Sequence, residues 1–170
     1  MSLFPKLSII LIMNIMASST SQTKLNVTST SFTDNGNIPS KYSCEGTQAS
    51  PPLAITGVPS GAKSLALILH DPDAPAPGGF THWVVWNIPT DGNIPEDFKG
   101  AEQGFNGAKR SGYIGMCPSS GTHHYHFKVY ALDTRLTINR NTDKAGLEKA
   151  MTGHILGEGE IVGLYAKMKK

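Results

Sequence analysis

The sequence lacks an extended cluster of basic residues, an internal repeat and a low-complexity linker. Its 15 Lys and Arg residues nearly balance 13 Asp and Glu residues, and the formal net charge is only +2. Nucleic acid is therefore not an expected partner, because binding to a phosphate backbone needs clustered Lys and Arg. At 170 residues without a linker, the chain has the size of one compact domain.

Several catalytic motifs are also missing from the sequence. It contains no His-Glu-x-x-His, no Gly-x-Ser-x-Gly and no Cys-x-x-Cys. These absences argue against a helix-borne zinc peptidase, a serine hydrolase of the nucleophile-elbow type and a cysteine-ligated zinc site. Glycine and proline, in contrast, are plentiful at 18 and 11 residues, which indicates many turns rather than a helical bundle.

The longest apolar run, interrupted by Ser8 and Asn14, lies at the N-terminus. Lys6 precedes the run over residues 7–16, and the small residues Ala17-Ser18-Ser19 follow it. This order is typical of a secretory signal, and the run is short for a membrane span. We expect residues 1–23 to be a signal peptide and a disordered start, and residues 24–170 to form the domain. The expected location is the periplasm or the exterior, with at most peripheral membrane contact; without a working signal it would be the cytoplasm.

Only two cysteines are present, Cys44 and Cys117, each in a stretch rich in glycine or proline. In an exported chain an even number of cysteines favours one disulfide. The alternative is two separate, partly buried thiols.

Strand-like stretches recur between turn signals over residues 24–32, 64–70, 82–88, 125–132 and 161–166. One helix is expected late in the chain. Its apolar positions are Leu147, Met151 and Ile155, its N-cap lies at residues 141–142, and the glycines at 157 and 159 end it. The pattern predicts a mainly β domain of antiparallel sheets with one C-terminal helix.

A first motif follows the expected strand at 64–70. It reads Asp71-Pro-Asp-Ala-Pro, then Gly78-Gly-Phe-Thr-His-Trp83. The prolines fix the backbone around Asp71 and Asp73, so that both carboxylates have defined positions at the end of the strand. His82 returns on the same side of the loop, where a carboxylate would raise its pKa and fix its tautomer. By itself the motif could also be an ordinary turn.

A second motif reads Gly112-Tyr-Ile-Gly-Met-Cys-Pro118, then Gly121-Thr-His-His-Tyr125. It brings His123 to the start of another strand, so that two histidines and two aspartates can line one pocket. Charged imidazoles can donate hydrogen bonds to a phosphate or carboxylate, and glycines allow backbone N–H groups to approach the same anion. The aspartates are expected to orient the imidazoles or to accept hydrogen bonds from an ammonium, as in phosphoethanolamine.

These motifs resemble the phosphatidylethanolamine-binding protein family, also called the Raf kinase inhibitor-like family, in its bacterial-type branch. Residues 42–46, 50–53 and 87–89 fit as well, so that the likeness covers residues 25–166. It implies Greek-key-like sheets and a non-enzymatic protein without a cofactor. Such a protein would bind a small anion or phospholipid head group and would regulate a kinase or protease partner. The binding residues that it implies are Asp71, Asp73, His82, Gly115, Pro118, His123 and Tyr125.

The chain also departs from the family pattern. A Gly-Pro-Cys-Pro-Pro run is replaced by Gly115-Met-Cys-Pro-Ser119, and an arginine is replaced by His124. An alternative function is a hydrolase that uses the same pocket, either with a metal held by the histidines and aspartates or with a Cys117–His123 nucleophile pair. Alternation along a strand places His124 and His126 opposite His123, where they would face solvent.

Overall fold

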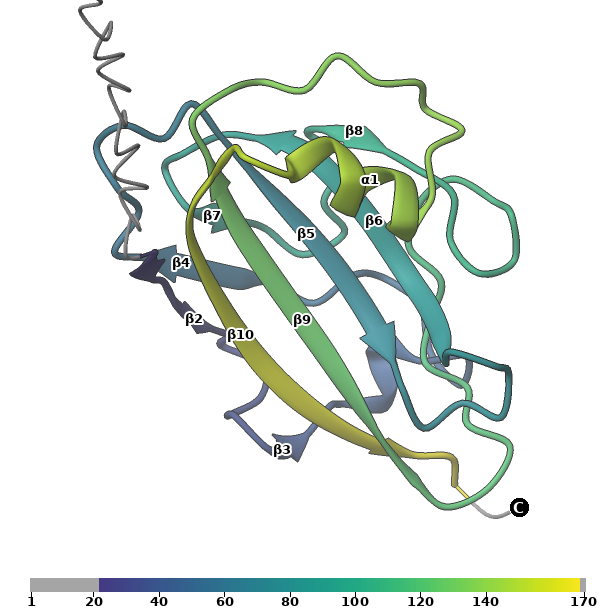
Figure 1. Ribbon diagram of the computed structural model, residues 1–170. Coiled ribbons are helices and arrows are strands. Elements are labelled where there is room, and N and C mark those ends of the chain that lie inside the picture. Colours follow the sequence, from purple (N-terminus) through teal and green to yellow (C-terminus); the bar gives the residue numbers. More distant parts are fainter. Residues whose placement is uncertain (1–21, 169–170) are drawn as a thin grey trace, which may run out of the picture.

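The computed structural model describes residues 22–168, so that residues 1–21 of the expected signal peptide and disordered start, predicted for residues 1–23, lie outside the described residues. Two sheets make up most of the domain (Figure 1). The larger sheet has the order β1-β10-β9-β5-β6-β8, with β3 also paired to β10. Its strands are β1 Thr23–Lys24, β3 Gly36–Asn37, β5 Ser64–Asp71, β6 Phe80–Ile88, β8 Glu102–Gln103, β9 Thr122–Leu132 and β10 Ile155–Ala166.

The smaller sheet packs on one face of the larger one. It has the order β2-β4-β7, with β2 Asn26–Thr28, β4 Leu53–Thr56 and β7 Asn93–Ile94. The main core lies between the two sheets, where Leu67 of β5 and Phe127 of β9 meet Ile55 of β4. β5 is central and almost wholly apolar, because both of its faces are buried.

A short helix, α1 Lys144–Met151, lies on the other face of the larger sheet, next to β6 (Figure 1). Leu147 and Met151 of α1 pack with Ile68 and Trp86 of the sheet in a second apolar cluster. The fold prediction is confirmed: the domain is mainly β and largely antiparallel, with one α-helix among its described residues. The two parallel pairings, β1 with β10 and β3 with β10, involve two residue pairs each.

The predicted limits of the helix were wrong at both ends. Asp143 is the N-cap and its carboxylate accepts a hydrogen bond from the Gly146 backbone N–H, so that the helix begins after residues 141–142. It ends at Met151, and Gly153 has a positive φ of 82°. Ile155 belongs to β10, yet it packs on the same apolar cluster as the helix, which explains why it matched the helical spacing.

The stretch at residues 24–32 is also not one strand. β1 pairs with β10 of the larger sheet, and β2 pairs with β4 of the smaller sheet. Leu25, between them, and Val27 are both buried in the main core. The chain therefore passes from one sheet to the other within a few residues, a crossing that a local alternating pattern does not indicate.

Candidate functional site

A cavity of about 330 Å³ opens where three strands of the larger sheet begin or end. β5 ends there with Asp71, while β6 and β9 begin there and carry His82 and His123. The loop over residues 114–119 forms another part of the cavity wall. The lining residues are Asp71, Ala74, Pro75, Ala76, Phe80, His82, Ile114, Gly115, Cys117, Pro118, Ser119 and His123.

Asp71 is the last residue of the otherwise nearly apolar strand β5 and is only 3% exposed. One carboxylate oxygen accepts hydrogen bonds from the backbone N–H groups of Asp73 and Ala74, at 2.9 and 3.1 Å. The other oxygen lies 2.8 Å from Nδ1 of His123. Because both oxygens are engaged, Asp71 serves to orient the imidazole of His123, one of the two roles that the sequence left open.

His123 is 8% exposed and lies on β9, two residues before Tyr125. Asp71 can only accept at Nδ1, so that this nitrogen carries a hydrogen and Nε2 is the ring nitrogen left for a ligand. A second proton on the ring would make an ion pair with the buried carboxylate. The carboxylate of Asp71 is thus placed to compensate a charge on this ring.

His82 reaches the cavity through a β-bulge. The register of β5 and β6 changes from Leu69 opposite Trp83 to His70 opposite Thr81, which leaves His82 as the extra residue. A bulge redirects a side chain relative to strict alternation. His82 therefore lines the cavity although its neighbour Trp83 lies in the main core.

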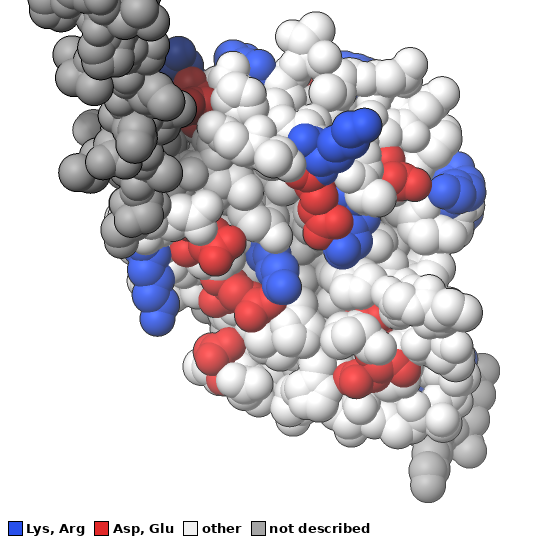
Figure 2. All heavy atoms as spheres, in the orientation of Figure 1, with Lys and Arg blue, Asp and Glu red and all other residues white. Residues whose placement is uncertain are grey.

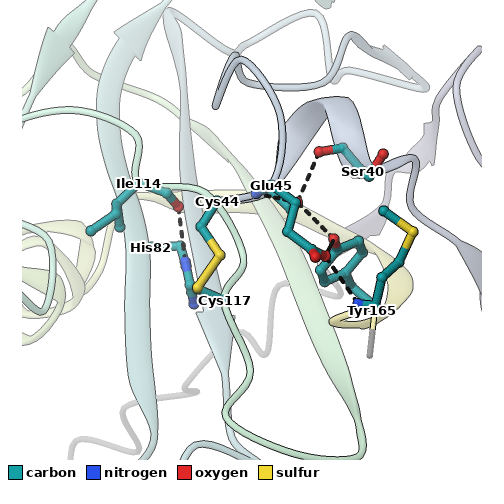
Figure 3. Close-up of a disulfide and its surroundings, with 9 residues drawn as sticks. Ser40, Cys44, Glu45, His82, Ile114, Cys117 and Tyr165 are labelled. Atoms are coloured by element: carbon teal, nitrogen blue, oxygen red, sulfur yellow. Dashed lines mark hydrogen bonds between the residues drawn. A yellow bond between two sulfur atoms is a disulfide. The ribbon is translucent and has the colours of Figure 1, made fainter. Parts of the chain in front are cut away.

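The ring of His82 is fixed by the loop that closes the cavity. Its Nδ1 lies 2.9 Å from the carbonyl oxygen of Ile114, beside the disulfide (Figure 3). Burial lowers the pKa of His82, and its hydrogen bond to Ile114 and the charge of Asp71 oppose this shift only in part. The expectation that a carboxylate neighbour holds both pocket imidazoles in the charged form was therefore wrong for His82.

The histidines of the sheet end predict how stability depends on pH. Burial lowers the pKa of both His82 and His70 in the folded state. The ordinary pKa of a histidine is about 6.5, so that near and below this pH the unfolded state binds more protons than the folded state does. The free energy of unfolding should therefore fall as pH drops from 7.5 to 5.5, as urea denaturation would measure. His70→Gln should reduce this pH dependence, and an unchanged slope in this variant would contradict the assignment.

Tyr125 lies beneath the cavity and does not line it. Its ring is edge-on to His82 and stacked with His123, at centroid distances of 5.3 and 6.4 Å. Its hydroxyl is buried without a hydrogen-bond partner of good geometry within the described residues. Burial, together with the charge of Asp71, raises the pKa of Tyr125, so that the phenol stays neutral and supports both imidazoles by packing.

Asp73 lies outside the cavity lining. β5 ends at Asp71, and the turn that follows directs the Asp73 side chain to the surface, where its carboxylate accepts hydrogen bonds from the backbone N–H and Nδ1 of His124. These bonds lower the pKa of Asp73. The carboxylate of Asp73 thus does not line the cavity, although its backbone N–H is bonded to Asp71.

His124 is mostly exposed, as alternation predicted, and His126 pairs with Glu160 on the same face of the sheet.

The cavity loop is joined to the N-terminal part of the domain by the Cys44–Cys117 disulfide, with Cα atoms 5.4 Å apart (Figure 3). The predicted disulfide is confirmed, and in this oxidised form Cys117 has no free thiol to serve as the nucleophile of a Cys117–His123 pair. Gly115 is required beside it, because a Cβ there would lie 2.8 Å from the Ser43 carbonyl carbon. Pro118 follows the disulfide and lines the cavity.

Sequence reasoning did not identify the apolar wall of the cavity. It is formed by Phe80 and Ile114 together with Pro75 and Ala76. All four lie inside or next to the two motifs, so that treating each motif loop as a continuous surface would have included them. A hollow of about 390 Å³ lies elsewhere, along β1, β9 and β10, and both basic and acidic residues line it.

Two further observations concern the described residues as a whole. No group of three or more His, Cys, Asp or Glu side chains in residues 22–168 is arranged to hold a metal ion. In the same part of the chain, no helix has the length and apolar character needed to cross a membrane. On the α1 side of the molecule, acidic and basic side chains are interspersed (Figure 2).

The fold defines a small β-rich domain with a cavity at one end of its main sheet. Residues 28–166 match the model of the phosphatidylethanolamine-binding protein family. The chain belongs to this family, as the sequence motifs predicted.

Relatives and solved structures agree with this assignment. The chain is 46% identical over 151 residues to a UPF0098 protein of Methanothermobacter thermautotrophicus, covering 84% of this chain and 99% of the relative. A crystal structure of a phosphatidylethanolamine-binding protein homologue from Chlamydia trachomatis superposes with a TM-score of 0.82 at 41% identity, covering 85% and 99% of the two chains. Escherichia coli YbcL gives a TM-score of 0.78 at 33% identity, covering 87% and 100%.

Proposed function

We propose that this protein binds a small phosphorylated anion, free or as a phospholipid head group, in the cavity between Asp71, His82 and His123, and does not transform it. The observation that carries the proposal is the convergence of two buried histidines on one cavity, each with Nδ1 already engaged and Nε2 left for a ligand. Family membership supports a binding protein of this kind.

The cavity has one wall with histidines and an aspartate and another wall that is apolar, and we expect each to contact a different part of the ligand. A doubly protonated His123 donates a charged hydrogen bond from Nε2 to an anionic oxygen, and Asp71 behind it compensates the positive charge. The apolar wall around Phe80 and Ile114 contacts the carbon part of an ester. In the described residues no hydroxyl or thiol is hydrogen-bonded to His123, which supports binding rather than nucleophilic catalysis.

We also propose export of the protein to an oxidising compartment. The Cys44–Cys117 disulfide supports this location, because such bonds persist mainly outside the reducing cytosol. Fractionation of cells that express the full chain would test the proposal, and recovery in the cytosol with both thiols reduced would contradict it.

The binding proposal predicts a single anion site. In titration calorimetry at pH 6, inorganic phosphate and phosphoethanolamine should each bind with a stoichiometry of one. Ala76→Trp should weaken or block binding, because Ala76 lines the cavity from an exposed position and a large ring there would take up space that the ligand needs.

A matched control is His154→Ala, which removes an exposed histidine paired with Asp133 at the other end of β9. This variant should bind as the unchanged protein does. Binding that is unaffected by Ala76→Trp would place the ligand elsewhere and overturn the proposal.

A further inference from the structure

The fold fixes which nitrogen of His82 carries a hydrogen. A backbone carbonyl can only accept, so that the 2.9 Å contact with Ile114 requires a hydrogen on Nδ1. In the neutral ring, Nε2 then presents a lone pair to the cavity. A ligand atom facing it must donate a hydrogen bond, unless the ring takes up a second proton.

The surroundings of His82 disfavour that second proton. The side chain is 5% exposed and, unlike His123, has no carboxylate hydrogen-bonded to its ring. Phe80 is edge-on to it at a centroid distance of 4.9 Å, and Tyr125 packs edge-on as well. The titratable groups that act on it are Asp71, which favours the charge, and His70 and His123, which oppose it.

The two histidines therefore differ in what they can recognise. His123, backed by Asp71, can become a cation that donates to an anionic oxygen, while neutral His82 can only accept at Nε2. Two equal donors would suit any tetrahedral anion. One donor and one acceptor suit an anion that retains a hydrogen on one of its oxygens.

We propose that the cavity selects a phosphate group that carries its own proton, the monoanion of a phosphomonoester or of inorganic phosphate, whose P–O–H donates to Nε2 of His82. A negatively charged oxygen of the same group accepts from Nε2 of His123. The inference rests on the proposed function and narrows it to one chemical class. The phosphate that joins a membrane phospholipid to its head group is a diester and has no such proton.

The selection should appear as discrimination between ligands of similar size. Methyl phosphate can hold the proton near neutral pH, since the second pKa of a phosphomonoester is about 6. Sulfate is a dianion without a proton, so that it differs from the methyl phosphate monoanion in both charge and proton. Dimethyl phosphate is a monoanion without a proton, so that it matches the charge of the methyl phosphate monoanion and lacks its P–O–H donor. We expect methyl phosphate to bind at least about tenfold more tightly than either, the size of effect expected for one charged hydrogen bond.

Titration calorimetry of the full chain at pH 6 with these three ligands is the test. His82→Gln places an N–H donor near the position of Nε2 and should bring the affinity ratio of methyl phosphate to sulfate toward one; His154→Ala should leave the ratio unchanged. Nitrogen-15 NMR of the methyl phosphate complex should show Nε2 of His82 without a hydrogen, which needs no variant and stands if His82→Gln does not fold.

The outcomes separate this inference from the proposed function. If none of the ligands binds, the proposed function fails. If sulfate or dimethyl phosphate binds as tightly as methyl phosphate, or if Nε2 of His82 is protonated in the complex, the anion site stands and the selection is refuted. Glycerophosphoethanolamine distinguishes the lipid source: affinity equal to that of methyl phosphate would also refute it, because the ammonium would then supply the donor.

Discussion

Removing the Cys44–Cys117 disulfide is expected to lower the free energy of unfolding by about 4 kcal/mol. The bond joins residues 73 positions apart in the sequence, and its main effect is to restrict the unfolded chain. The neighbouring contacts do not depend on it covalently: the Cys44 backbone N–H donates to the Met116 carbonyl oxygen at 3.0 Å. The native arrangement should therefore survive as a less stable fold.

Guanidinium denaturation of the Cys44→Ser/Cys117→Ser double variant measures this loss. The unchanged protein with a reductant serves as the control, because it should lose a similar amount without any change of sequence. If the reduced protein keeps its full free energy of unfolding, the disulfide contributes packing near the cavity rather than stability.

Replacing His123 by alanine is expected to weaken phosphate binding by about 10- to 150-fold, the loss for one hydrogen bond to a charged group. His123 supplies the only imidazole in the cavity with a hydrogen-bonded carboxylate behind it. Since the bound anion favours the doubly protonated ring, binding takes up a proton, and affinity should fall as pH rises. Calorimetry from pH 5.5 to 8.5 measures both effects.

Asp71→Asn tests whether the carboxylate acts through His123. An amide in this place can donate to Nδ1 and cannot compensate a charged ring, so that the variant should lose part of the affinity and most of its pH dependence. A merely structural role would lower affinity equally at every pH. Control titrations use Asp133→Asn, which removes the carboxylate of the exposed His154 pair.

For the His123→Ala variant, an affinity equal to that of the unchanged protein would contradict the proposal that the cavity is the phosphate-binding site.

Local patterns in the sequence were sufficient for the parts of the fold in which neighbours along the chain decide the structure. The apolar run at 64–70 became β5, and the alternating stretch at 125–132 became most of β9. Prolines, glycines and histidines in the two motifs indicated the loops that meet at the end of the sheet. The even cysteine count indicated the disulfide, which the structure contains.

Contacts between distant segments decided the rest. Asp71 and Asp73 have the same spacing as two residues on one strand face, but β5 ends between them and His124 holds Asp73 at the surface. Ile155 matched a helix because it packs on the same cluster as α1, although it reaches that cluster from β10.

His82 shows the physical reason most directly. Strict alternation along β6 would place His82 on the face of the sheet away from that of Trp83. Only the shifted pairing with β5 brings His82 into the cavity. Its protonation pattern depends in turn on a carbonyl 32 residues away, at Ile114. Residue types determined that two histidines and an aspartate were available. Strand register and burial determined which nitrogen each histidine presents, because both depend on atoms that only the folded chain brings together.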